Sequence, residues 1–255
     1  MKRSLMLCLA VACLFVWSAP AVSAQEMPTN YTFVAEWAVP RQNWADWRAN
    51  FDRYSKPVFE RHAASGNLVG WGAFESIVHT EDGITHGTFW TAPSFAALNA
   101  VLNDLLKATP ASAFPATKHR DYLLTSVAGQ SKASPLTTGF IYVSSYLLQP
   151  GKGGAWMELW NKYNKPGFAD DFAKGNLLAY SIDVEDVHTA DPGLRFVVSI
   201  SPNAEADDRS VTTQDAANAK RSAEERRAIG AAFADTIVPG SHRDFYARLI
   251  AYWRK

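Results

Sequence analysis

The feature that most constrains the fold of this chain is a set of three motifs that occurs twice. In the first half the motifs are Tyr-Ser-Lys-Pro (54–57), Gly-Asn-Leu (66–68) and His-Thr-Glu-Asp (79–82), and in the second half they are Tyr-Asn-Lys-Pro (163–166), Gly-Asn-Leu (175–177) and His-Thr-Ala-Asp (188–191). The separations 163 − 54, 175 − 66 and 188 − 79 all equal 109 residues. Common residues aligned by chance would not keep one separation over three motifs. The chain is therefore predicted to be a tandem duplication whose halves share one fold.

Hydrophobic periodicity predicts the same order of elements in each half. Strands are expected at 31–39, 68–78, 84–91 and 119–127 in the first half, with helices that begin at Gln42 and Pro93. Strands are expected at 140–148, 177–187, 194–201 and 242–252 in the second half, with helical regions at 155–174 and 205–237. Pro57 is expected to kink the first helix, and Gly66 to end it in the left-handed conformation.

The order strand-helix-strand-strand-helix-strand is the ferredoxin-like arrangement, so the predicted fold class is α+β. A four-stranded sheet with its helices on one face leaves the other face apolar, and a second repeat can cover that face. We expect two tandem ferredoxin-like βαββαβ repeats, 25–128 and 139–255, packed sheet to sheet and joined by a linker at 129–138. A closing His-Arg-Asp motif recurs with the separation 242 − 119 = 123, so the second repeat holds 123 − 109 = 14 extra residues, which are expected around 205–214.

Residues 1–24 have the pattern of a secretory signal peptide. Two basic residues precede an apolar stretch that is too short to span a bilayer, and Val-Ser-Ala (22–24) offers a cleavage site before Gln25. The mature chain is thus expected to be exported, to the periplasm or the extracellular medium. Both cysteines, Cys8 and Cys13, lie in the signal, so disulfides and cysteine nucleophiles are excluded from the mature chain. Its 23 basic and 25 acidic residues favour neither nucleic acid nor stable membrane insertion.

The His-Arg-Asp motifs are the candidate catalytic groups. Because side chains alternate along a strand, the His and Asp of each motif are expected on one face and the Arg on the other. A carboxylate on the same face can orient an imidazole and raise its basicity, which would suit a general base, while the arginine could stabilise negative charge. The alternative is a structural network at the strand entry, since buried polar groups need partners whatever the function. The six residues are His119, Arg120, Asp121, His242, Arg243 and Asp244.

Six further residues are candidate ligand contacts. The tyrosines and lysines of the duplicated Tyr-x-Lys-Pro motif are expected on a helix that walls a pocket, where they could bind an anionic or carbonyl-bearing ligand. The histidines of the His-Thr-x-Asp motif are expected at hairpin turns, where Thr and Asp can also serve only to fix the turn. For both groups the structural role remains the alternative. The residues are Tyr54, Lys56, Tyr163, Lys165, His79 and His188.

The element order and the duplication resemble the dimeric α/β-barrel superfamily over essentially the whole mature chain. That superfamily includes antibiotic-biosynthesis-monooxygenase-like and NIPSNAP-like proteins and, with haem, chlorite-dismutase-like proteins and dye-decolourising peroxidases. The resemblance implies a cofactor-independent oxygenase, isomerase or cyclase acting on a small aromatic or hydrophobic compound, and a homodimer is compatible with it. The contrasting hypothesis is a non-catalytic ligand-binding or stress-related envelope protein, so whether the protein is an enzyme stays open.

No cofactor is predicted from the residues. The sequence contains no Gly-x-Gly-x-x-Gly or Walker loop, no Gly-x-Ser-x-Gly elbow and no His-Glu-x-x-His zinc motif. Haem held by one histidine, or a metal ion, stays open through the resemblance alone.

Overall fold

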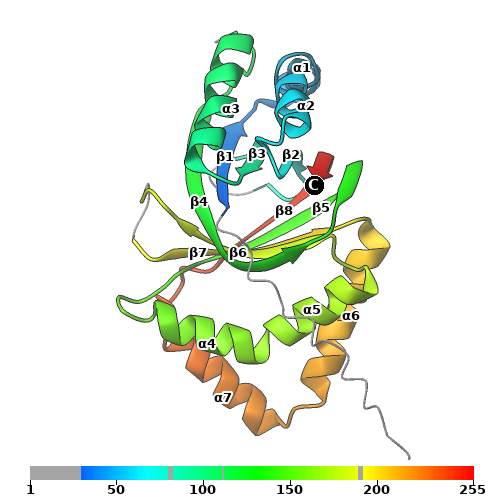
Figure 1. The fold of residues 1–255 in the computed structure, drawn as a ribbon. Coiled ribbons are helices and arrows are strands. Elements are labelled where there is room, and N and C mark those ends of the chain that lie inside the picture. The colour runs from blue at the N-terminus through cyan, green and yellow to red at the C-terminus, as the bar shows by residue number, and fades with distance from the viewer. Residues whose placement is uncertain (1–29, 80–82, 111, 189–191) are drawn as a thin grey trace, which may run out of the picture.

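The computed structural model shows eight strands that close into a barrel, with helices on its two outer sides (Figure 1). It describes residues 30–79, 83–110, 112–188 and 192–255. The predicted signal peptide and the Thr and Asp of the two His-Thr-x-Asp motifs lie outside these residues. Around the barrel the strand order is β1-β3-β2-β8-β5-β7-β6-β4. The predicted α+β fold, with two ferredoxin-like sheets packed face to face, is thereby confirmed.

The first repeat supplies one half of the barrel, β4-β1-β3-β2, and the upper helices in Figure 1. All its sheet pairings are antiparallel, as a ferredoxin-like unit requires. Its elements are β1 (Tyr31–Ala38), α1 (Trp44–Asn50), a π-helical turn (Phe51–Ser55), α2 (Lys56–Ala64), β2 (Gly70–Ser76), β3 (His86–Ala92), α3 (Phe95–Ala108) and β4 (Lys118–Ser131).

The second repeat supplies the other half, β8-β5-β7-β6, and the lower helices in Figure 1. The two halves join where β2 pairs with β8 and β4 pairs with β6, again antiparallel. Its elements are β5 (Ser134–Leu147), α4 (Gly153–Tyr163), α5 (Lys165–Lys174), β6 (Ala179–Glu185), β7 (Leu194–Ser201), α6 (Ala204–Ala219), α7 (Ala223–Ala234) and β8 (Arg243–Arg254). The strands β4 and β5 extend into the expected linker and leave only residues 132 and 133 between them.

The repeated Lys-Pro motif interrupts the first helical region of each half. Proline lacks the N–H that a helix interior needs and clashes with the preceding turn. In the first repeat the helix widens into a π-helical turn directly before Pro57, which occupies the first turn of α2. In the second repeat a break at Asn164 separates α4 from α5, where proline again occupies the first turn. Gly66 and Gly175 follow these helices with φ of 81° and 80°, as expected of left-handed caps.

The 14 extra residues of the second repeat lie later than the sequence predicts. Phe95, which begins α3, and Ala204, which begins α6, are still separated by 204 − 95 = 109 residues. The insertion therefore follows the start of α6, and the expectation of 205–214 is wrong. It forms the end of α6 and the additional helix α7, which is fixed by a capping box between Ser222 and Glu225.

Hydrophobic residues form three separate cores, one in each layer of the molecule. One core, which includes Trp47 and Trp90, lies between the first sheet and its helices. Another, with Trp156 and Trp160, lies on the helix side of the second sheet and takes in side chains of the inserted segment. The third, around Leu249, lies inside the barrel. No helix among the described residues is both long and apolar enough to cross a membrane.

Candidate functional site

A cleft of about 480 Å³ lies between the helices and the sheet of the first repeat. We call it the helix–sheet cleft. Aromatic and aliphatic side chains form most of its wall, and polar groups gather where β4 begins. It is lined by Phe33, Ala35, Trp37, Ser55, Phe59, Thr88, Trp90, Leu102, Leu105, Leu106, Thr109, Pro110, Phe114, Ala116, Thr117, Lys118, His119 and Asp121.

His119 and Asp121 share the face of β4 that lines this cleft, as the strand alternation predicts. Nε2 of His119 lies 3.1 Å from Oδ1 of Asp121, and both side chains are a little under half exposed. The imidazole stacks on Trp37 with ring centroids 5.1 Å apart. The nearby carboxylate raises the pKa of His119 above its ordinary value, although partial burial acts in the opposite direction. The pair is therefore oriented, basic and open to a ligand in the cleft.

His242 and Asp244 repeat the geometry on β8 without the cleft. Nε2 of His242 lies 2.9 Å from Oδ1 of Asp244, and the imidazole stacks on Tyr146 at 4.6 Å between centroids. Burial opposes ionisation of Asp244, but hydrogen bonds from Ser144 and Tyr142 and the charge of His242 outweigh it, so its pKa lies below the ordinary value. His242 and Asp244 line neither of the two cavities described here.

The two arginines of the motifs differ in their contacts. Nε of Arg120 donates to Oε2 of Glu36 at 2.5 Å, and Glu36 lines the barrel interior. Nη1 of Arg243 donates to the backbone carbonyls of Gly240 and His242, both at 2.7 Å, and so holds the chain at the entry to β8. Arg120 therefore takes the face opposite His119, in agreement with the alternation of the strand.

The six ligand-contact candidates line neither cavity. Tyr54 is half-buried beside Arg53, Lys56 lies 4.0 Å from Asp52, and the ring of Tyr163 lies under Arg221. Lys165 is exposed. His79 is exposed and meets the edge of Trp44, and His188 lies 4.0 Å from Glu185. The structure does not bring the six together.

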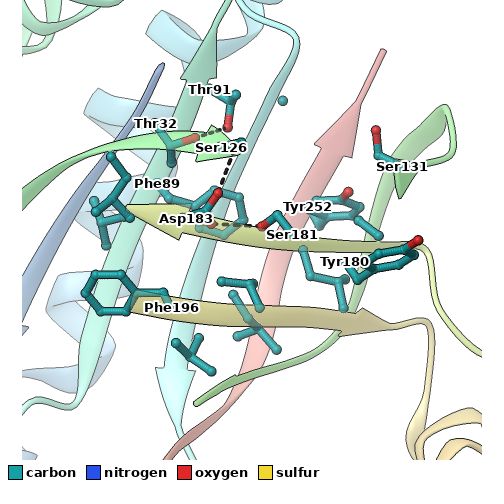
Figure 2. Close-up of a pocket in the computed structure, with 18 of the residues that line it drawn as sticks. Thr32, Phe89, Thr91, Ser126, Ser131, Tyr180, Ser181, Asp183, Phe196 and Tyr252 are labelled. Carbon is teal, nitrogen blue, oxygen red and sulfur yellow. Dashed lines mark hydrogen bonds between the residues drawn. The ribbon is translucent and has the colours of Figure 1, made fainter. Parts of the chain in front are cut away.

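Sequence reasoning missed a second cavity, of about 140 Å³, inside the barrel (Figure 2). Its most distinctive residue is Asp183 on β6, which is only 5% exposed. Burial raises the pKa of this carboxyl, although hydrogen bonds from Ser126 and Ser181 and the charge of Arg254 act in the opposite direction. A signal was present: residue 183 − 109 = 74 is Phe74, so the two repeats carry a carboxylate and a phenyl ring at one position.

The residues of the helix–sheet cleft do not fit haem ligation through Nε2 of His119. His119 is the one histidine in the cleft lining, and that nitrogen already faces Asp121 at 3.1 Å. Among the described residues no group of three or more His, Cys, Asp or Glu side chains is arranged to hold a metal ion. An absorption spectrum and elemental analysis of the purified protein test both cofactors directly.

Comparison with solved structures identifies the fold as a dimeric α/β barrel. A proposed monooxygenase from Fusobacterium nucleatum subsp. nucleatum aligns with a TM-score of 0.64 and 9% identity over 90% of this chain and 96% of that chain. A proposed monooxygenase from Lactobacillus acidophilus NCFM aligns with a TM-score of 0.60 and 9% identity over 89% of this chain and 96% of that chain. An anthrone oxidase-like protein aligns with a TM-score of 0.56 and 11% identity over 90% and 94% of the two chains. At these identities the likeness shows the fold alone. No protein-family model and no curated protein matches the sequence.

Proposed function

We propose that the helix–sheet cleft binds a flat, largely hydrophobic aromatic compound and that the protein is an oxygenase that needs no bound cofactor. The observation that carries the proposal is the position of His119, whose imidazole lines an aromatic cleft with Asp121 at 3.1 Å. Aromatic walls of this kind, with a few polar groups at one end, are typical of small-molecule sites. An imidazole held by a carboxylate is a suitable general base near neutral pH.

The chemistry begins with transfer of an acidic C–H proton from the bound compound to His119. The carbanion that remains is rich in electrons and reduces O2, which enters as the second substrate. For a CH2 group between aromatic rings, one oxygen atom becomes the carbonyl oxygen of the product and the other leaves as water. The compound thus loses two hydrogens and gains one oxygen, which balances the consumption of one O2.

Lys118 is the cation placed to stabilise the developing negative charge. It lines the same cleft as His119, whereas Arg120 is held by Glu36 on the opposite face of the sheet. A cation beside developing charge lowers the barrier most where the wall of the site is apolar. The role that the sequence suggested for Arg120 therefore passes to Lys118 in this proposal.

The neighbours in structure support the choice of reaction class. Two are proposed monooxygenases and one is anthrone oxidase-like. An isomerase or cyclase would use the same proton transfer without O2, and a binding protein would use the cleft alone. Oxygen consumption separates these alternatives.

The test uses anthrone and related tricyclic aromatics with an activated CH2 group as substrates. Binding is followed by quenching of tryptophan fluorescence, since Trp37 and Trp90 line the cleft, and turnover by an oxygen electrode. His119→Gln is expected to lower turnover by roughly 100-fold or more, the usual contribution of a general base, and to change binding only a few-fold. His242→Gln, which alters the equivalent pair where no cleft is described, is the matched control and should leave turnover unchanged.

Equal effects of His119→Gln and His242→Gln would contradict the assignment of the base. Binding of the aromatic panel without oxygen consumption would leave the non-catalytic binding protein as the function. A product of unchanged oxygen content would identify an isomerase or cyclase.

Asp121→Asn tests the positioning role of the carboxylate separately from folding. The pKa of His119, measured by NMR titration of its ring protons, should fall because the carboxylate that raises it has been replaced by a neutral amide. The pH at which turnover reaches half its maximum should fall with it, since the base must be deprotonated. An unchanged pKa would show that Asp121 does not act on His119.

We also propose that the protein is exported after removal of residues 1–24, on the pattern of the N-terminal segment. Fractionation of cells and N-terminal sequencing of the purified chain test this proposal. A first residue at Gln25 in the exported fraction is expected, and an intact N-terminus in the cytoplasm would refute it.

A further inference from the structure

The cavity inside the barrel is separate from the helix–sheet cleft. The two share no lining residue, because they lie on opposite faces of the first sheet. On β1, for example, Thr32, Val34 and Glu36 face the barrel interior, whereas the side chains between them face the cleft. An inference about the barrel interior is thus independent of the function proposed for the cleft.

One wall of this cavity is polar and is built around Asp183 (Figure 2). Ser126 on β4 donates to Oδ1 of Asp183 at 2.6 Å, and Ser181 on β6 donates to Oδ2 at 2.8 Å. Thr32 and Thr91 form a further hydroxyl pair, at 2.9 Å, on the neighbouring strands. A carboxylate has about four acceptor positions, so two serine bonds leave Asp183 able to accept another donor.

The opposite part of the lining is apolar. It consists of rings and branched aliphatic side chains from both repeats, which belong to or pack against the core inside the barrel. The residues are Phe74, Phe89, Ile141, Val143, Phe196, Val198 and Ile200.

The charges around the cavity are balanced. Asp183 is accompanied by Arg254, which also lines the cavity and donates to Ser131 at 3.0 Å, while Glu36 is paired with Arg120. An ion brought into this space would add an uncompensated charge at low dielectric. The cavity therefore suits a neutral molecule.

The scaffold alone does not account for a carboxylate at this place. Under the offset of 109, Asp183 and Ser181 correspond to Phe74 and Gly72, and under the offset of 123 Ser126 corresponds to Leu249. The first repeat thus builds the same sheet with apolar residues at all three positions. Because burial of a carboxylate is unfavourable unless it is compensated, the polar cluster is an addition to one half and points to a ligand.

We propose that the barrel interior is a second small-molecule site, for a compact, uncharged aromatic ring that carries a hydroxyl group. The volume of about 140 Å³ is close to that of an engineered protein cavity, roughly 150 Å³, known to hold benzene. The ring lies against Phe89, Phe196 and Val198, and the hydroxyl donates a hydrogen bond to Asp183.

The test measures binding of phenol and of benzene to the full mature chain, with amide chemical shifts to locate each ligand. In the wild type, both should perturb amides of β4, β6 and β7, and phenol should bind more tightly. Asp183→Asn preserves the size of the side chain but removes its charge. It should weaken phenol binding about tenfold or more, because a hydrogen bond to a charged group is lost, and change benzene binding by less than about threefold.

Val198→Phe places in the second repeat the residue that the first repeat carries at the same position, since 198 − 109 = 89. The larger ring should fill the cavity and abolish binding of both compounds. Leu105→Trp, which narrows the helix–sheet cleft, and Val211→Phe, on the exposed surface of α6, are the controls and should leave both affinities unchanged.

Phenol shifts confined to the helix–sheet cleft, no binding at millimolar phenol, or undiminished binding by folded Val198→Phe would each overturn the proposal. Should Val198→Phe fail to fold, the shift map and the phenol-to-benzene ratio of Asp183→Asn still decide. An unchanged ratio in Asp183→Asn would remove the hydroxyl from the proposed ligand class and overturn the proposal as stated.

Discussion

Replacing Asp171 by alanine should destabilise the protein more than any change at the neighbouring surface. Asp171 is fully buried on α5. Its Oδ1 accepts a hydrogen bond from Nδ2 of Asn176 at 3.0 Å, and its Oδ2 accepts one from Ser210 on α6 at 2.8 Å. Oδ1 of Asn176 in turn accepts from Nε of Arg209 at 3.0 Å. One carboxylate thus connects α5, the segment before β6 and α6.

The expected loss follows from the two donors that would be left without an acceptor. Each buried polar group that loses its partner costs about 1–3 kcal/mol. Two such groups, with part of the cost recovered by local rearrangement, give about 3–5 kcal/mol, which is also the range for breaking a buried charged network. For a chain of this size the corresponding fall in Tm is roughly 6–20 °C.

The assay is thermal unfolding followed by circular dichroism, with Asp170→Ala as the matched control. Asp170 is the adjacent residue and makes an exposed ion pair with Lys174 at 2.6 Å, in the i,i+4 arrangement. Such pairs contribute about 0.3–0.5 kcal/mol, so Asp170→Ala should lower Tm by no more than about 2 °C. If the two variants lost equal stability, the buried network would not have the role assigned to it here.

Three further predictions concern local features. Burial, reinforced by the charge of Arg41, lowers the pKa of His86 to about 4; its contribution to stability, up to about 3 kcal/mol, is therefore present above about pH 6.5 and lost as the pH falls toward 4, and urea titrations should show a smaller loss in His86→Gln. Gly87→Ala should cost about 1–3 kcal/mol, because its new Cβ would lie 2.1 Å from Cζ of Phe74, and a Tm within 2 °C of wild type would contradict this. Ser222→Ala removes the cap of α7 and should cost about 1 kcal/mol by the same measurement, with no loss expected if α7 contributed nothing to stability.

Local rules were sufficient for the scaffold where one residue dictates the backbone. Pro57 interrupts its helix and Gly66 ends it, because each residue permits few alternatives. The same kind of rule failed for the insertion. The sequence showed that 14 residues were added between two fixed motifs, but α6 and α7 are both polar helices, and only the start of α6 at Ala204 shows which of them is the addition.

The candidate sites show the same limit. His119 and Asp121 could be placed on one face by strand alternation, yet nothing local shows that a cleft lies beside them and not beside His242. Whether a cleft forms depends on how α3 packs over the sheet, which is a property of the tertiary structure. Asp183 sits in an ordinary strand sequence and only the comparison with Phe74 distinguishes it, because its partners come from strands distant in the sequence.

The fusion of the two halves into one chain gives the barrel interior a freedom that two identical subunits would lack. A barrel formed by identical subunits carries every interior residue twice, so an aspartate at position 183 would bring a second carboxylate into the same enclosed space, and each would oppose the ionisation of the other. Here Phe74 stands where the second carboxylate would be. The interior therefore has distinguishable ends, and a guest molecule would enter with a single orientation and a stoichiometry of one per barrel.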